Sequence, residues 1–311
     1  MMRFKVMKPI SGRRGGGCDG FIVVAVLWLI AALATLAAIY SLSVRETAAA
    51  FSGRDDRLLA QALAQAGVEL AVQQMTAIPE ARPSHGGASL RLGGADIAVE
   101  FRSENGRIDL NAAPREVLAG LFTSLGARRE DAEGFAERIT AWRTPPTAGT
   151  ADEEASLYRV AGKRYGPRRS LFQHVNELAL VLGLQGALLD RALPYLTVYS
   201  GQPEVNVLTA APEVLAALPG LTPERLHDFI LQREIAPQDV LRARLGPTAR
   251  YVTAQAGNSV RITVDVRFDA QRRARSEVVA LVLNGDVEPY RVLSWRDEIE
   301  EPPPPPASGG R

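Results

Sequence analysis

The sequence has little cysteine and little histidine. Its one cysteine, Cys18, lies near the N-terminus, and its three histidines, His85, His174 and His227, lie far apart. A single cysteine excludes an intramolecular disulfide. Scattered histidines, with no HExxH pair and no second cysteine to share a metal, argue against a zinc site. A metal site built from cysteine and histidine ligands is therefore not expected.

Motifs for nucleophilic or phosphate chemistry are also missing. No serine lies in a GxSxG sequence. Gly162 and Lys163 are followed by Arg164 and lack the spacing of a P-loop. These absences argue against an enzyme, and a signal-anchored envelope hydrolase has no residues to support it. With 36 basic and 35 acidic residues, the net charge is +1, so no overall field favours nucleic acid.

Charge is absent from one long stretch, which runs from Gly20 to Val44 and contains the apolar segment 21–40. Twenty helical residues span roughly the 30 Å of a bilayer core, so the segment predicts a transmembrane helix. Five basic residues precede it, which keeps residues 1–20 cytoplasmic and exports the rest. A buried core helix is one alternative. A secretory signal peptide cleaved after Ala37 or Ala38 is the other.

The helical pattern continues beyond the membrane segment. No proline interrupts the chain from Phe21 to Ile78, and apolar residues recur at helical spacing as far as Thr76. A single helix of this length would be on the order of 80 Å long. The residues expected to face a soluble domain are Leu59, Ala62, Leu63, Ala66, Leu70 and Met75. A signal anchor followed by an unrelated linker helix is the alternative.

Strand patterns flank a helical middle. The runs 89–92 and 96–102, separated by Gly93 and Gly94, predict a β-hairpin. Strict alternation over 260–268 predicts a half-buried strand, and 276–283 and 290–295 predict two more. Between them, helices are expected at 133–142, 175–184 and 221–231. The residues from Glu300 to Arg311 contain five consecutive prolines and are expected to form an extended, disordered tail.

The middle also contains an internal repeat at an offset of 97 residues. IDLNAAPREVLAGL from Ile108 aligns with VNVLTAAPEVLAAL from Val205. Each copy predicts a short strand and then a helix that begins with proline and glutamate, which suit the first turn. We interpret the repeat as two similar helix starts within one α-helical unit.

Several stretches together resemble a known family. A basic leader that ends in Gly20 and is followed by Phe21 and an apolar helix is similar to the prepilin signal of type IV pilins and pseudopilins. The stretches GFIVVAVLWL at 20–29, GRIDLNAAPREVLAGL at 106–121, SLFQHVNELALVLGL at 170–184, VNVLTAAPEVLAALPGL at 205–221 and YRVLSWRDE at 290–298 resemble the K-type minor pseudopilins of type II secretion systems. Ala25, the fifth residue after Gly20, fits the same group, which lacks the glutamate common at that position.

The resemblance implies an α+β, type IV pilin-like fold. Its long N-terminal transmembrane helix would pack on an antiparallel sheet, and a large α-helical domain would be inserted into that sheet. The expected parts are a prepilin leader at 1–20, a spine helix at 21–77, a β-domain at 78–109 and 258–296, a helical domain at 110–257, and a tail at 297–311. Cleavage between Gly20 and Phe21, followed by N-methylation of Phe21, is implied as well.

The implied function is structural. The chain would cap the tip of the pseudopilus and act in its initiation and in protein secretion across the outer membrane. Expected partners are the I-type and J-type minor pseudopilins, other pseudopilins, the prepilin peptidase and the inner-membrane assembly platform. The expected location is the bacterial inner membrane, as a single-pass protein with its soluble domain in the periplasm. No cofactor is expected.

Two further hypotheses come from resemblance. Some members of the family bind calcium in the inserted domain, and Asp152, Glu153 and Glu154 are the candidate ligands here. Ca²⁺ needs 6 to 8 oxygen ligands, so three carboxylates in one run are an incomplete set, and a solvated loop is the alternative.

LPGLTPERL at 218–226 resembles half of a helix-hairpin-helix motif, which leaves a membrane-anchored DNA-binding receptor of the competence type as the alternative function. Acidic neighbours of Arg225 and Arg233 weigh against phosphate binding.

Overall fold

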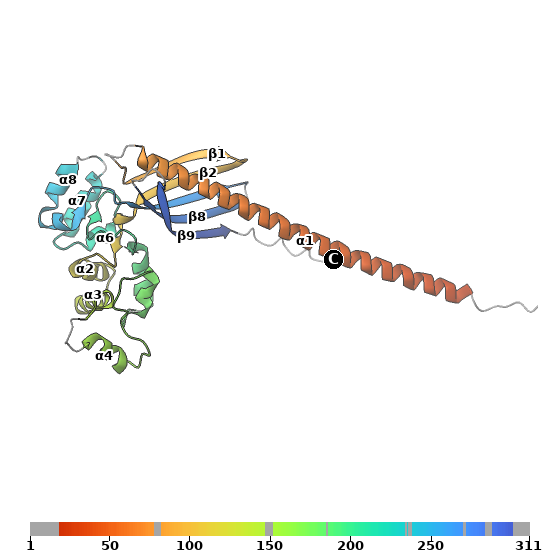
Figure 1. Ribbon diagram of the computed structural model, residues 1–311, viewed down its shortest axis with the longest axis horizontal. Coiled ribbons are helices and arrows are strands. Elements are labelled where there is room, and N and C mark those ends of the chain that lie inside the picture. Colours follow the sequence, from red (N-terminus) through yellow and green to blue (C-terminus); the bar gives the residue numbers. More distant parts are fainter. Residues whose placement is uncertain are drawn as a thin grey trace, which may run out of the picture. The chain divides into compact units, whose positions relative to one another are not determined.

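The computed structural model describes residues 19–77, 82–146, 152–184, 186–233, 235, 238–269, 272–283 and 288–300. The chain divides into two compact units, 1–59 and 60–311. The helix α1 (Asp19–Thr76) runs through the boundary between them. The second unit contains the sheet and the remaining described helices, several of which Figure 1 labels.

The main sheet has five antiparallel strands in the order β1-β2-β7-β8-β9. These strands are β1 (His85–Leu92), β2 (Ala95–Ser103), β7 (Ser259–Arg267), β8 (Arg273–Val282) and β9 (Tyr290–Glu300). The predicted hairpin is confirmed as β1 and β2, and both glycines of its turn have positive φ. The strand β9 continues to Glu300, so the boundary predicted at residue 296 is wrong by four residues of regular pairing.

One face of this sheet packs against residues 60–76 of α1. The buried side chains of the helix differ from the predicted stripe, because Leu59 is exposed whereas Ala64, Val68 and Val72 are buried. Of the predicted residues, only Leu63 and Met75 are buried. The physical reason is close approach: a Cβ added at Gly67 would lie 2.8 Å from the side chain of Val264. The helix therefore lies closest to the sheet at Gly67, and Val68, Val72 and Met75 are buried in the core beside it.

The helical part lies between β2 and β7 in the sequence and has its own hydrophobic core. Its α-helices are α2 (Arg115–Ser124), α3 (Arg129–Arg143), α4 (Glu153–Val160), α5 (Ala187–Ala192), α6 (Pro212–Ala216), α7 (Pro223–Gln232) and α8 (Gln238–Arg244). Its 3₁₀-helices are η2 (Glu104–Gly106), η3 (Val175–Leu180), η4 (Leu193–Tyr195) and η5 (Gly246–Tyr251). The helix predicted at 175–184 is instead the shorter 3₁₀-helix η3. Val181 after it is extended, and the amide of Leu182 donates to the hydroxyl of Tyr158.

The internal repeat is visible in the backbone. Strand β3 (Ile108–Asp109) pairs in parallel with β4 (Leu196–Thr197), and β5 (Val205–Asn206) pairs in parallel with β6 (Val252–Thr253). Each first strand leads through a tight turn into a helix, α2 or α6. The two helices cross at Gly120, where an added Cβ would lie 1.9 Å from the carbonyl oxygen of Ala217. The two copies thus pack against each other within one core.

Candidate functional sites and related proteins

The apolar segment forms part of α1. Residues Val23–Leu42 are long and apolar enough to cross a membrane, and their side chains are exposed. Ala25 lies in this segment, and its methyl group is exposed. Gly20 and Phe21 lie in the first turn of α1. The leader residues 1–18 are outside the described part of the chain, so the predicted processing between Gly20 and Phe21 stays a prediction.

The three calcium candidates lie at the start of α4 and do not converge. The carboxylate of Asp152 accepts from the amide of Ala155 at 2.9 Å, as a helix cap, and forms a two-point ion pair with Arg169. The pKa of Asp152 is lowered, first by the Ala155 hydrogen bond and also by Arg169. Glu153 is exposed. In the described residues no group of three or more acidic, histidine or cysteine side chains could hold a metal ion.

Glu154 has a different environment from its neighbours. Its Oε1 atom is buried without a hydrogen-bond partner, and burial raises the pKa of this carboxyl group. Raising the pKa opposes the ionised form that a hard cation requires. The guanidinium group of Arg169, which pairs with Asp152, also donates to the carbonyl oxygen of Ala141. Arg169 is held in the left-handed backbone region, at φ 59°.

A buried ion pair joins the sheet to the helical part. Glu104, in η2, is 1% exposed, and its carboxylate accepts from Arg261 of β7 at 2.5 and 2.9 Å and from the Thr197 hydroxyl at 2.5 Å. Arg261 also pairs with Glu277 of β8. Burial alone would lower the pKa of Arg261, but its bonds to Glu104 and Glu277 raise it. Nothing in the sequence indicates this pair, because its members are 157 residues apart.

A second buried carboxylate organises the first copy of the repeat. Asp109 is 1% exposed and accepts from the amide of Asn111 at 2.7 Å, the amide of Gly201 at 2.8 Å and the hydroxyl of Ser200 at 3.0 Å. Asn206 stands at the matching position of the second copy and accepts from the amide of Leu208 at 2.9 Å. Both side chains stabilise the turn that leads from strand to helix, so their role is structural.

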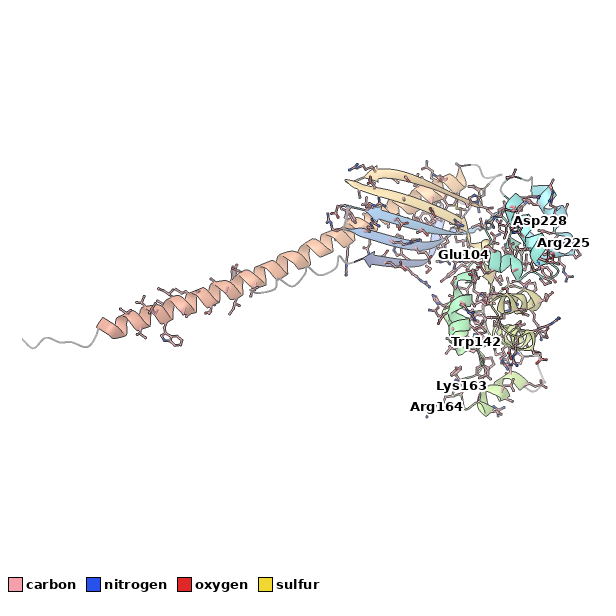
Figure 2. The ribbon with its side chains drawn as sticks, turned by 180° about the vertical axis from the view of Figure 1, so that it is seen from behind. Glu104, Trp142, Lys163, Arg164, Arg225 and Asp228 are labelled. Atoms are coloured by element: carbon pink, nitrogen blue, oxygen red, sulfur yellow. The ribbon has the colours of Figure 1, made fainter. Side chains whose placement is uncertain are left out.

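Two arginines near the helix pairs α2–α3 and α6–α7 form hydrogen bonds within the fold. Arg143 of α3 donates to the carbonyl oxygens of Leu110 and Ala113, and Arg233 donates to that of Ala210, the residue that matches Ala113. In the motif that resembles a DNA-binding hairpin, Gly220 has φ 84° and the Thr222 hydroxyl caps α7. Figure 2 shows Arg225 on this helix together with Asp228. No observation here favours a phosphate site.

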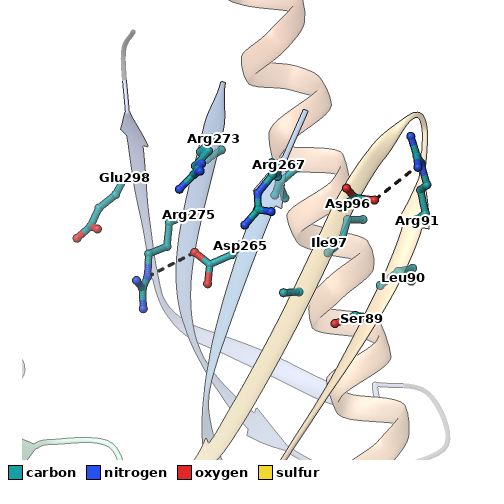
Figure 3. A pocket seen from close by; sticks show the side chains of 13 residues that line it. Ser89, Leu90, Arg91, Asp96, Ile97, Asp265, Arg267, Arg273, Arg275 and Glu298 are labelled. Atoms are coloured by element: carbon teal, nitrogen blue, oxygen red, sulfur yellow. Dashed lines mark ion pairs between the residues drawn. The ribbon is translucent and has the colours of Figure 1, made fainter. Parts of the chain in front are cut away.

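The sheet face opposite α1 carries a groove of about 820 Å³. Figure 3 shows arginines and carboxylates around it, and they come from all five strands of the sheet. Arg91 pairs with Asp96 and Arg275 pairs with Asp265, each at 3.8 Å. Such long, exposed pairs contribute little to stability. This surface was not predicted from the sequence, because it depends on the register of the strands.

The comparisons with known proteins agree with this architecture. The family model described as "Type II secretion system (T2SS), protein K" matches residues 98–201. The type II secretion system protein K of Pseudomonas aeruginosa PAO1 is 26% identical over 148 residues, which is 44% of this chain and 44% of that protein. The matched segment thus spans less than half the length of that relative.

A solved structure extends the likeness in fold. A chain of the GspK-GspI-GspJ complex from the type 2 secretion system of enterotoxigenic Escherichia coli matches with a TM-score of 0.60 and 16% identity. The match covers 79% of this chain and 98% of that chain. The predicted α+β, pilin-like fold is confirmed. Over residues 98–201 the chain is similar to protein K of type II secretion systems, and it shares the pilin-like fold of the matched solved chain.

Proposed function

We propose that this chain is a structural subunit at the tip of the pseudopilus, where it acts in pseudopilus initiation and in protein secretion across the outer membrane. It would be a single-pass protein of the bacterial inner membrane, with unit 60–311 in the periplasm and no catalytic role. Its proposed partners are the I-type and J-type minor pseudopilins, the other pseudopilins, the prepilin peptidase and the inner-membrane assembly platform. The related solved structure is a complex of three such proteins, which supports the first two partners.

The observation that carries the proposal is the inserted helical part. It joins β2 to β7, which are neighbours in the sheet, and its core is separate from the core that contains α1. A filament built from pilin-like subunits stacks their compact sheet domains. A subunit with this additional bulk would clash with another subunit stacked above it, so it fits the end of a filament.

Ala25 supports the same position independently. In a pilin filament, the glutamate at this position is proposed to neutralise the N-terminal amine of an adjacent subunit, because an unpaired charge in hydrocarbon costs several kcal/mol. A subunit with alanine at this position cannot form this ion pair. It is therefore suited to a position in the filament where no adjacent subunit needs its N-terminal amine neutralised. The tip is such a place.

Immunogold labelling of isolated pseudopili tests the tip position. We expect label at one end of each filament, with a major pseudopilin labelled along the length as the control. Deletion of the gene should reduce pseudopilus initiation and secretion, and excess protein should shorten filaments or reduce their number. The variant Ala25→Glu should still label only one end, because the helical part remains. Label spread along the shaft would contradict the proposal.

Processing at the N-terminus is tested separately by mass spectrometry of the membrane-bound protein. We expect a mature chain that begins with N-methylated Phe21. The variant Gly20→Val should keep its leader, because a bulky side chain replaces the small residue before the cleaved bond. A wild-type chain that begins after Ala37 or Ala38 would show secretory signal cleavage and contradict the pseudopilin processing.

A further inference from the structure

One arginine binds oxygen atoms from the ends of two helices. The guanidinium group of Arg169 forms a two-point ion pair with the carboxylate of Asp152, the residue before α4. Its Nη1 atom donates to the carbonyl oxygen of Ala141 in α3 at 2.6 Å, and to that of Thr144, the residue after α3, at 3.5 Å. The arginine thus joins the end of α3 to the start of α4.

The oxygen atoms that Arg169 binds are of the kind that a calcium ion uses. Ca²⁺ is held by carboxylate oxygens and main-chain carbonyl oxygens. A guanidinium group binds a carboxylate through two parallel hydrogen bonds and carries a permanent positive charge. A calcium ion on Asp152 would have to displace this group or lie beside it, where like charges repel. The calcium ion that the family resemblance implies therefore does not fit the site as this chain folds.

The backbone holds Arg169 in an unusual conformation. Among the residues that the structure describes, it is the one non-glycine residue with positive φ, at 59°. Such a conformation persists where the surrounding structure fixes it. The ring of Phe172 stacks on Trp142 of α3 with centroids 6.0 Å apart, and the amide of Phe172 donates to Asn111 at 2.7 Å. The segment that carries Arg169 is thus anchored to the helical core by contacts other than the ion pair.

We propose that the guanidinium group of Arg169 is a built-in cation that takes the structural place of a bound metal ion and holds α4 to α3. The joint between the two helices is then independent of divalent cations. Removal of the guanidinium group should convert its acceptors into a weak calcium site. These acceptors are both carboxylate oxygens of Asp152 and the carbonyl oxygens of Ala141 and Thr144, and water would supply the remaining ligands.

The test compares the full wild-type chain with Arg169→Gly in detergent micelles. Glycine adopts positive φ readily, so the substitution removes the side chain without adding backbone strain. Hydrogen exchange of the α4 amides is the measurement, because this joint can open without unfolding the whole unit. In the presence of a chelator, the α4 amides of the variant should exchange at least about tenfold faster than those of wild type. Millimolar Ca²⁺ should slow this exchange in the variant and leave wild type nearly unchanged.

Three further variants separate the cation site from other effects. Arg164→Gly removes an exposed arginine with the same change in net charge, and it should behave like wild type. Arg169→Lys keeps a cation at the site, so its α4 amides should not respond to Ca²⁺ even if they exchange somewhat faster. Asp152→Asn, combined with Arg169→Gly, should abolish the calcium response, whereas asparagine can still cap α4.

The proposal is overturned if Arg169→Gly exchanges like wild type, because the guanidinium group would then hold nothing. Faster exchange that Ca²⁺ does not slow would also overturn it, since Arg169 would then form an ordinary ion pair. A calcium response that survives Asp152→Asn would place the metal elsewhere and contradict the assigned ligands. The tip position of the chain is independent of all these results and is tested by labelling.

Discussion

At the residue scale, the molecule depends on a few buried charges whose partners come from distant parts of the chain. Glu104 and Asp109 are almost completely buried, and each accepts at least three hydrogen bonds. A buried carboxylate without such partners would be strongly disfavoured. Glu104 joins the main sheet to the inserted helical part, and Asp109 holds the turn between β3 and α2, so single substitutions there should affect the whole unit.

Glu104→Gln should lower the free energy of unfolding by about 3 kcal/mol, because it removes one partner of a buried ion pair. Arg261 would keep Glu277, which lies nearer the surface and compensates in part. Urea unfolding of the full chain in micelles, followed by tryptophan fluorescence, measures the change. Glu100→Gln, an exposed glutamate on β2, is the control and should change stability by less than about 0.5 kcal/mol. Similar midpoints for the two variants would contradict the assigned role of Glu104.

Calcium should change the stability of the chain little. The Asp152 carboxylate is already bound by Arg169 and by the Ala155 amide, so few oxygen atoms are left for a cation that needs 6 to 8. A ligand that binds only the folded state raises its melting temperature. Thermal unfolding with and without millimolar Ca²⁺ is the measurement. A rise of several degrees that disappears in Asp152→Ala with Glu153→Ala would show a calcium site and refute this expectation.

At the element scale, the two copies of the repeat are held together by close helix contact. Helices α2 and α6 touch where Gly120 faces the backbone of Ala217, and no side chain fits between them. Arg143 of α3 and Arg233, the residue after α7, then donate hydrogen bonds to the turns that precede α2 and α6. Close packing and arginine hydrogen bonds thus make one unit from two short hairpins.

Gly120→Ala should destabilise the fold by about 1–3 kcal/mol or more, because the added methyl group would overlap the carbonyl oxygen of Ala217. Gly134→Ala in α3 is a matched control. A Cβ there meets nothing within 4 Å, and alanine is favoured over glycine in a helix by about 1 kcal/mol. Thermal unfolding should therefore shift in opposite directions for the two variants. A rise in the melting temperature of both variants would mean that helix propensity, not contact, controls position 120.

At the scale of the whole molecule, stability should fall at alkaline pH. Burial raises the pKa of Tyr158 to about 12, and it also raises the pKa of Tyr290 to about 12, where a hydrogen bond to Glu69 adds to the effect. An unfolded tyrosine loses its proton near pH 10. Between about pH 10 and 12, unfolding therefore releases protons, so the free energy of unfolding decreases as pH rises and is fully retained below pH 10.

Tyr290→Phe should reduce this slope, because it removes one of the tyrosines whose pKa is raised in the folded chain. The substitution also removes the hydrogen bonds that join β9 to Gln65 and Glu69 of α1, so stability at neutral pH should fall slightly. Unfolding measured at intervals from pH 8 to 12 in wild type and variant gives both slopes. Parallel curves would show that Tyr290 titrates normally in the folded chain.

The sequence by itself determined the kinds of element and their order. The uncharged segment, the absence of proline as far as Ile78, the alternation in β7 and the repeated strand-helix pattern are local signals. Local periodicity depends on neighbours within a few residues, and it decides helix or strand without reference to the rest of the fold. Hence the long helix, the sheet flanking a helical middle, and the resemblance to protein K were all predictable.

Only the tertiary structure decided which side chains meet. In the folded chain Leu59 is exposed and Ala64 is buried. Glu104 forms an ion pair with Arg261, and Asp152 forms one with Arg169. The tertiary structure also placed Arg267 opposite Arg273, since strand register sets which residues face each other. These contacts join residues far apart in the chain. They depend on the shape of the packed side chains, the way the helices cross and the register of the strands. No local sequence pattern indicates these three properties, so the buried ion pair and the open groove could be identified only in the folded molecule.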